Sequence, residues 1–240
     1  MSAVRTTEVE HVAAAVTEVI ERVFDTVAEL HPAALHVLQA GANAGGAEAA
    51  LEAQVRALLA APGQFAVGLG LIVAPRPENG VHRRLHWWQV DPAAGRLVAL
   101  DPDLRSSSLG FYDYTAADWF AVPQRTGRRH VVGPYVDVHG TGRYLLTLTG
   151  PVVAGGEFLG VVGADVPVTR FEGHLLRALA SVDRPFVVRN DEDRVVLSTS
   201  PRRLVGDLLR SADELPGPGR QVPGVPWRVH LVEDGERPRA

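Results

Sequence analysis

The spacing of apolar residues changes near residue 63 of this 240-residue chain, and the change restricts the folds available to it. Before that point, apolar side chains recur at steps of three and four, which is the period of an amphipathic α-helix. From Phe65 onward they occur in short runs bounded by glycine, which is typical of β-strands. The sequence therefore predicts an α/β (α+β) fold in which a helical region precedes antiparallel sheets.

Residues 1–62 are expected to form two helical segments. The first carries a narrow stripe of valines with nearly heptad spacing. Such a stripe can pack against a sheet of the same chain, or it can pair with a second copy in a homodimer, and both alternatives stay open. His31-Pro32 and the glycine-rich stretch 41–46 are predicted to interrupt the helical pattern, which resumes around Leu51 and Val55.

Two groups of strands follow the helices. The larger group is predicted at 65–74, 85–90, 96–100, 131–138, 143–153 and 157–166. Its last three strands are joined by glycine turns and form an antiparallel meander. A helix at 170–179 leads to a smaller group at 186–190, 194–198 and 227–232, with a further helix at 202–209. The chain is thus expected to divide into a helical region (1–62), a large sheet module (63–180), a smaller one (181–232) and a polar tail (233–240).

The composition argues against several classes of function. The chain has no cysteine, which excludes disulfides, thiolate metal sites and thiol nucleophiles. Its net charge of -4 supplies no general basic field that would attract nucleic acid. The sequence holds neither a Gly-x-Ser-x-Gly motif nor histidines at metal-ligand spacing. We therefore expect a protein that is not an enzyme, with no catalytic residue, no metal and no cofactor.

The sequence also lacks the patterns that direct a chain to a membrane. Acidic residues such as Glu18, Glu21 and Asp25 lie among the valines of the first segment, where a secretory signal needs an unbroken apolar run. No stretch approaches the roughly twenty apolar residues that a membrane span requires. We therefore predict a chain with no membrane span and a cytoplasmic location.

Bulky aromatic residues and aspartates are interleaved in the middle of the chain. The candidate binding residues are Tyr112, Trp119, Phe120, Tyr135, Asp137 and Asp165. Aromatic faces attract an organic cation, and carboxylates neutralise its charge and accept its hydrogens, so this combination suits a positively charged amine. An anionic ligand would be repelled by the same residues. The alternative is that the aromatic residues form ordinary core and that the aspartates are turn residues and helix caps.

Four blocks of this region carry a family resemblance. They are Trp119-Phe120, Gly133-Pro-Tyr-Val-Asp137, Leu146-Thr-Leu-Thr-Gly-Pro-Val152 and Phe158-Leu-Gly-Val-Val-Gly-Ala-Asp-Val166. Their order and spacing resemble the ligand-binding module of the Cache sensory superfamily. The segment 186–200, followed by Gly206-Asp-Leu, is similar to the smaller module of double Cache domains. The resemblance implies a long helix followed by two PAS-like modules, of which the larger, 63–180, binds the ligand.

The resemblance also implies roles for the candidate residues. Many double Cache domains that bind amino acids share a tyrosine, an arginine two residues before a Trp-aromatic pair, a Tyr-x-Asp element and a later aspartate. In that pattern the arginine pairs with the ligand carboxylate, and the other residues hold its ammonium group. This chain supplies Tyr112, Trp119-Phe120, Tyr135 with Asp137, and Asp165, but Ala117 stands at the arginine position.

The chain keeps the residues that hold the ammonium group but lacks the arginine that pairs with the ligand carboxylate, here called the carboxylate clamp. This combination resembles the amine-binding variant of the pattern. We therefore predict a small-molecule sensory domain for a cationic amine or quaternary-ammonium ligand, acting through a signalling partner that the sequence does not identify. An amino acid is the alternative ligand if Arg125, Arg128 or Arg129 replaces the missing clamp. A partner-binding or dimerisation module with a vestigial binding site is the alternative function.

Overall fold

The computed structural model describes residues 2–40, 45–76, 83–91, 93–138, 142–210 and 215–232. The helices are α1 (Ser2–Ala40), α2 (Gly45–Leu59), the 3-10 helix η3 (Tyr114–Ala116), α3 (Asp118–Thr126) and α4 (Val168–Ala178). The strands are β1 (Gly68–Val73), β2 (Arg84–Val90), β3 (Leu97–Ala99), β4 (His130–Val136), β5 (Tyr144–Ala154), β6 (Glu157–Pro167), β7 (Phe186–Arg189), β8 (Val195–Ser198), β9 (Arg220–Gln221) and β10 (Arg228–Leu231). The α/β fold expected from the sequence, with a long first helix and two antiparallel sheets, is confirmed.

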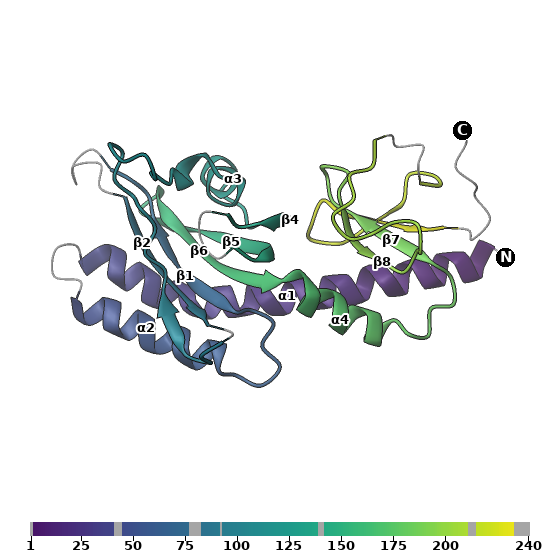
Figure 1. Cartoon of the computed structure of the whole chain (residues 1–240), viewed down its shortest axis with the longest axis horizontal. Coiled ribbons are helices and arrows are strands. Elements are labelled where there is room, and N and C mark those ends of the chain that lie inside the picture. Colours follow the sequence, from purple (N-terminus) through teal and green to yellow (C-terminus); the bar gives the residue numbers. More distant parts are fainter. Residues whose placement is uncertain are drawn as a thin grey trace. The chain divides into compact units, whose positions relative to one another are not determined.

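The chain forms two compact units. The large unit contains residues 22–132 and 136–167, and the small unit contains residues 1–21, 133–135 and 168–240. A six-stranded sheet in the order β3-β2-β1-β6-β5-β4 is the centre of the large unit. In Figure 1, α2 and α3 lie on opposite sides of this sheet. The sequence boundaries at residues 62, 180 and 232 stay predictions.

The strand register sorts the residues of the large sheet onto two faces. Leu71 on β1 pairs with Val162 on β6, which pairs with Gly150 on β5. A Cβ at Gly150 would lie 3.8 Å from a methyl carbon of Val27, so this face is covered by α1. Because side chains alternate along a strand, the next row of residues faces the other way, toward α3.

The first helix is longer than the sequence predicts. It continues through Pro32 to Ala40, so the expected interruption at His31-Pro32 is wrong, while the remaining helical pattern resumes as expected in α2. The valine stripe is buried within the chain: Val12, Val16 and Val27 are at most 3% exposed. The packing of the stripe inside the chain is therefore observed, and the homodimer stays a prediction. No helix among the described residues has both the length and the apolar character to cross a bilayer.

The small unit holds a four-stranded sheet in the order β8-β7-β10-β9. The first part of α1 belongs to this unit, and there Thr17 Oγ1, which donates to the carbonyl of Ala13 at 2.8 Å, lies 3.5 Å from the carbonyl oxygen of Pro223. The predicted helix at 202–209 is wrong. That segment forms turns, with Gly206 at a φ of 95° and an isolated bridge between Leu208 and Arg194. A left-handed residue inside the segment ends any helical run.

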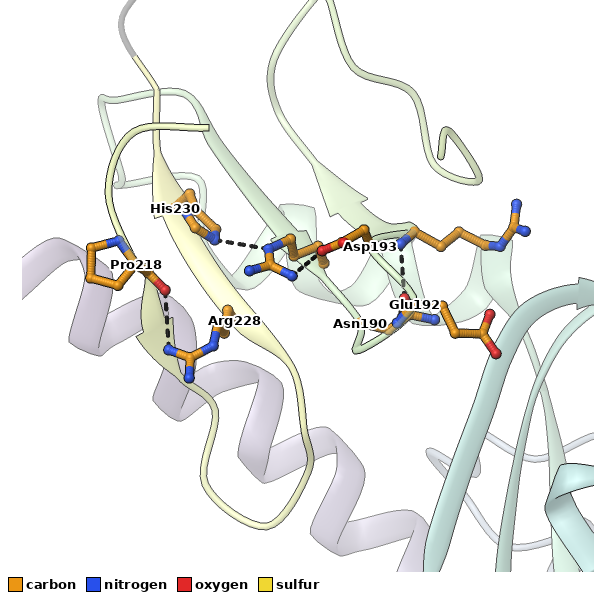
Figure 2. Close-up of polar contacts among 8 residues, drawn as sticks. Asn190, Glu192, Asp193, Pro218, Arg228 and His230 are labelled. Carbon is orange, nitrogen blue, oxygen red and sulfur yellow. Dashed lines mark hydrogen bonds and ion pairs between the residues drawn. The ribbon is translucent and has the colours of Figure 1, made fainter. Parts of the chain in front are cut away.

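A buried histidine joins several polar groups of the small unit (Figure 2). His230 on β10 is 2% exposed, and its Nε2 accepts a hydrogen bond from Arg189 Nε at 3.3 Å. Its Nδ1 lies 3.4 Å from the carbonyl of Pro216, which can only accept, so the proton resides on Nδ1. Burial lowers the pKa of His230, and the guanidinium groups of Arg189 and Arg228 add to this, while the Pro216 carbonyl and Asp193 oppose it.

We expect the small unit to lose stability as the pH falls below about 6.5. The unfolded chain protonates His230 more readily than the folded chain, because the folded pKa is lowered, so acid favours unfolding. Urea unfolding at pH 7.5 and pH 5.5 measures this loss. The loss should be smaller in His230→Gln, whose side chain does not titrate. An equal loss in both proteins would contradict the assignment.

Candidate functional site

Asp165 is the buried carboxyl group at the centre of the large sheet. It lies on β6, opposite Gly68 on β1 and Thr147 on β5, and therefore on the face that is turned toward α3. The residue is 6% exposed. Thr147 Oγ1 donates a hydrogen bond to Asp165 Oδ1 at 2.7 Å. The long antiparallel pairing of β5 with β6 thus fixes the position of a carboxyl group that the sequence predicts to bind a ligand.

The surroundings of Asp165 favour its neutral form. Burial raises the pKa of Asp165 to about 7, and the negative charge of Asp137 contributes to the increase. The hydroxyl of Thr147, the indole of Trp87 and the charge of Arg143 act in the opposite direction. Functional sites frequently contain a carboxyl group whose pKa is shifted toward neutral pH. A positively charged group brought to this position would restore the ionised form.

Trp87 on β2 lies on the same face of the sheet as Asp165, and its indole covers glycines of β1 and β6. A Cβ at Gly70 would lie 2.9 Å from its ring, and one at Gly163 would lie 3.3 Å from it, so the indole packs directly over the backbones of β1 and β6. A Cβ at Gly68 would lie 3.0 Å from Trp87 Nε1 and 3.2 Å from Asp165 Oδ2. The indole N–H is near enough to lower the pKa of Asp165, yet its geometry forms no hydrogen bond with any described residue.

A second carboxylate and a guanidinium lie near Asp165. Asp137 is half-buried at the end of β4, and its backbone N–H donates to the carbonyl of Arg143 at 2.9 Å. Arg143 Nη2 donates to the carbonyl of Val90 at 2.9 Å. Burial raises the pKa of the Tyr112 hydroxyl, and the charges of Asp137 and Asp165 raise it further. Tyr112 therefore stays protonated and is a hydrogen-bond donor close to both carboxylates.

Aromatic rings pack under α3 on the same face of the sheet. Trp119 is 7% exposed and Phe120 is fully buried, with the two rings 6.3 Å apart in an edge-on arrangement. Tyr114 and Phe158 complete the group, with their ring centres 5.3 Å and 5.5 Å from the ring centre of Phe120. Thr149, two residues from Thr147 on β5, donates its hydroxyl hydrogen to the carbonyl of Trp119 at 2.6 Å. This hydrogen bond ties the start of α3 to the sheet beside Asp165.

Five of the six predicted site residues belong to the same unit of the chain. Tyr112, Trp119, Phe120, Asp137 and Asp165 all belong to the large unit. Tyr135 is half-buried on β4, within the segment 133–135 that belongs to the small unit, and it stays a sequence-based prediction.

One aspartate of this region is a helix cap, as the alternative interpretation of the sequence proposes, but it is Asp113 and not one of the candidate binding residues. Asp113 caps η3 through Thr115 and pairs with Arg83 at 3.2 Å. Ala117 is the N-cap residue of α3, immediately before Asp118, and its side chain makes no capping hydrogen bond.

The three arginines that the sequence offered as partners for a ligand carboxylate have no contact with Asp165 among the interactions of the described residues. Arg125 and Arg128 are exposed at the end of α3, and the guanidinium of Arg129 lies 4.4 Å from the ring centre of Phe24. The guanidinium whose charge reaches Asp165 belongs instead to Arg143, which the sequence analysis missed. Trp87 and Thr147 were missed as well. The alternation along β2 and β5 places them on one face, but only the register shows that Asp165 shares that face.

Comparisons with known proteins give structural relatives only. No family model and no curated protein matches the sequence. The ligand-binding domain of the Pseudomonas fluorescens chemoreceptor CtaA in complex with L-valine is similar, with a TM-score of 0.58 at 14% identity, covering 99% of this chain and 100% of that one. The ligand-binding domain of the Pseudomonas aeruginosa amino acid chemoreceptor PctC in complex with GABA matches with a TM-score of 0.51 at 22% identity, covering 93% of this chain and 96% of that one.

The extracellular domain of a histidine kinase is a further relative. The domain of mmHK1S-Z3 matches with a TM-score of 0.56 at 13% identity, covering 82% of this chain and 71% of that one. These relatives are Cache-type sensory domains. The chain therefore has the fold of double Cache domains, as its four sequence blocks and the segment 186–200 predict.

Proposed function

We propose that this chain is a non-catalytic sensory domain that binds a small cationic amine beside Asp165 in its large unit. The observation that carries the proposal is the carboxyl group of Asp165, which is buried in the sheet with a second carboxylate, Asp137, close by. Burial of a carboxylate without a charge partner is costly, and a bound cation supplies that partner. A ligand with a lone carboxylate would instead add a further negative charge to the same region.

The aromatic residues near Asp165 support this choice of ligand. Trp119 and Tyr112 offer ring faces that attract a cation, and Phe120 backs the Trp119 ring. Hydrogen bonds from Thr147 and Thr149 hold Asp165 and the start of α3 in place, so the site is organised before the ligand arrives. In this proposal Asp165 and Asp137 are the charge partners, and the rings form the walls.

An amino acid is the second candidate ligand, and Arg143 favours it. Its guanidinium is close enough to act on Asp165, so the site offers a positive group as well as two carboxylates. The relatives solved with L-valine and with GABA bind molecules that carry both an amino group and a carboxylate. An amino acid places its ammonium group at Asp165 and its carboxylate toward Arg143.

A thermal-shift screen of the whole chain tests the proposal. The screen compares amines, amino acids and organic acids, each at several concentrations. A ligand at a hundredfold its Kd stabilises the folded chain by about 2.7 kcal/mol, which raises the Tm by several degrees. We expect stabilisation by compounds with an ammonium group. Stabilisation by organic acids alone would refute the amine ligand. Stabilisation by no compound at all would refute the proposal and favour the partner-binding alternative.

The signalling route of the chain is proposed by analogy with its fold. The relatives named above are domains of chemoreceptors and of a histidine kinase. We infer that ligand binding in this chain is likewise passed to a signalling partner. The cytoplasmic location stays a prediction from the sequence.

A further inference from the structure

Two buried polar atoms of β2 lack hydrogen-bond partners on the face that carries Asp165. They are Nε1 of Trp87 and Oε1 of Gln89. Neither atom forms a hydrogen bond of good geometry with any residue that the structure describes, although the indole N–H is near enough to Asp165 to lower the pKa of that carboxyl group. Trp87 is 4% exposed and Gln89 is half-buried. The indole N–H is a donor and needs an acceptor, whereas the amide oxygen is an acceptor and needs a donor.

The register places both side chains on the face of the sheet that carries Asp165, with β1 between them and β6. Gln89 and Asp165 are the two neighbours of Gly68, one on each side of β1. Trp87 is paired with Gly70 in the next row of the same face. Because Gly68 has no side chain, the indole N–H and Asp165 Oδ2 both approach the β1 backbone at this point. The donor, the acceptor and the carboxyl group therefore surround one glycine.

An unpartnered buried polar group is costly to keep. Each such group gives up its hydrogen bonds to water without gaining any in the folded chain, and folded proteins leave few of them. Two on one face of β2, in adjacent rows of the sheet that also contain a buried carboxyl group, indicate a guest that completes their hydrogen bonds. The other polar groups of the same rows, Thr147 and Thr149, already donate within the chain.

We propose that Trp87 and Gln89 select a primary ammonium ligand that carries an oxygen acceptor two or three bonds from its nitrogen. This inference rests on the proposed function, because it refines the ligand that Asp165 binds. The ammonium group donates to Asp165 and to Gln89 Oε1, and the neighbouring oxygen accepts from Trp87 Nε1. Hydroxyl, carbonyl and carboxylate oxygens all meet the second requirement, so amino alcohols and α-amino acids belong to this class.

The same requirements exclude two kinds of cation. A quaternary ammonium group has no N–H and leaves Gln89 Oε1 unpartnered. A plain alkylamine has no acceptor and leaves Trp87 Nε1 unpartnered. Sites that hydrogen-bond a polar group of the ligand discriminate strongly against analogues that lack it, because their own buried groups then stay unpaired. We therefore expect each analogue to bind at least tenfold more weakly than its parent.

Isothermal titration with four probes tests the inference on the full chain. The probes are 2-aminoethanol, L-alanine, propylamine and choline. We expect 2-aminoethanol or L-alanine to bind at least tenfold more tightly than propylamine and choline. The preference over propylamine should disappear in Trp87→Phe, which lacks the N–H, and the preference over choline should disappear in Gln89→Met. Trp88→Phe is the matched control, since it makes the same change on the opposite face of the same strand and should retain both preferences.

The outcomes separate this inference from the function on which it rests. Equal binding of propylamine and 2-aminoethanol, or preferences that survive in Trp87→Phe and Gln89→Met, would overturn the inference and leave the amine-binding function standing. Absence of binding by all four probes would count against both. Loss of preference in Trp88→Phe as well would show that general loosening of β2, rather than the two polar atoms, sets the selectivity.

Discussion

Asp165→Asn is expected to weaken the binding of a primary amine by more than tenfold while the fold stays intact. The substitution keeps the shape of the side chain and its acceptor oxygen for Thr147, but it removes the charge partner of the cation. Titration calorimetry of parent and variant measures the loss. Asp118→Asn, which changes an exposed aspartate on α3, is the matched control and should bind like the parent.

The stability of Asp165→Asn distinguishes loss of binding from loss of fold. Burial raises the folded pKa of Asp165 to about 7, well above the usual value of 3.8. The unfolded chain therefore ionises first, and the parent loses stability as the pH rises from about 4 through 7. One pKa unit corresponds to about 1.4 kcal/mol, so the ligand-free variant should be more stable than the parent at pH 8 by roughly 2 kcal/mol or more. The difference should shrink toward pH 4 in urea unfolding.

The pH dependence of binding provides a further readout of the same variant. A cation binds the ionised form of Asp165, so the affinity of the parent for an amine should rise about tenfold between pH 6 and pH 8. The affinity of Asp165→Asn should be flat over this range. A variant that binds amines as tightly as the parent, with the same pH profile, would remove Asp165 from the site.

Gly68→Ala is expected to reduce ligand affinity at least tenfold and to lower the stability of the folded chain moderately. The added methyl would lie 3.0 Å from Trp87 Nε1 and 3.2 Å from Asp165 Oδ2, so it occupies the place where these groups meet the ligand. Both atoms belong to side chains, which can move by a few tenths of an ångström. The cost of such overpacking is about 1–3 kcal/mol. Calorimetric titration and thermal unfolding measure the two effects.

Gly150→Ala is the control for this substitution. Its methyl would lie 3.8 Å from Val27, an ordinary contact, on the face of the same sheet that α1 covers. We expect this variant to bind like the parent. If Gly68→Ala also keeps the parent affinity, the ligand does not approach the sheet at Gly68, and the position of the site is wrong.

The residue pattern was sufficient for much of the fold. Short apolar runs bounded by glycine predicted the six strands of the large sheet, because alternation and turn chemistry are local properties. The same reasoning failed at 202–209, where spaced leucines suggested a helix and the chain forms turns. It also failed at Pro32, since proline removes one helical hydrogen bond and the packing of α1 compensates for the loss.

The candidate site was predicted only in part. The aspartates and aromatic residues were found because charge and ring type are visible in the sequence. Arg143 and Gln89 were missed, since neither is close in sequence to the residue on which it acts. The proposal of Arg125, Arg128 and Arg129 came from nearness along the chain, which says little about nearness across a sheet.

The helical stripe and the strand pattern were enough to predict the fold class from the sequence alone. The aromatic and acidic residues, with their family resemblance, gave the candidate binding residues. The tertiary structure decided which of those residues act together. The physical reason is that strand register and burial are properties of the whole sheet: pairing across β2, β1, β6 and β5 places Gln89, Gly68, Asp165 and Thr147 in one row. Exclusion of water from that row then raises the pKa of Asp165 toward neutrality.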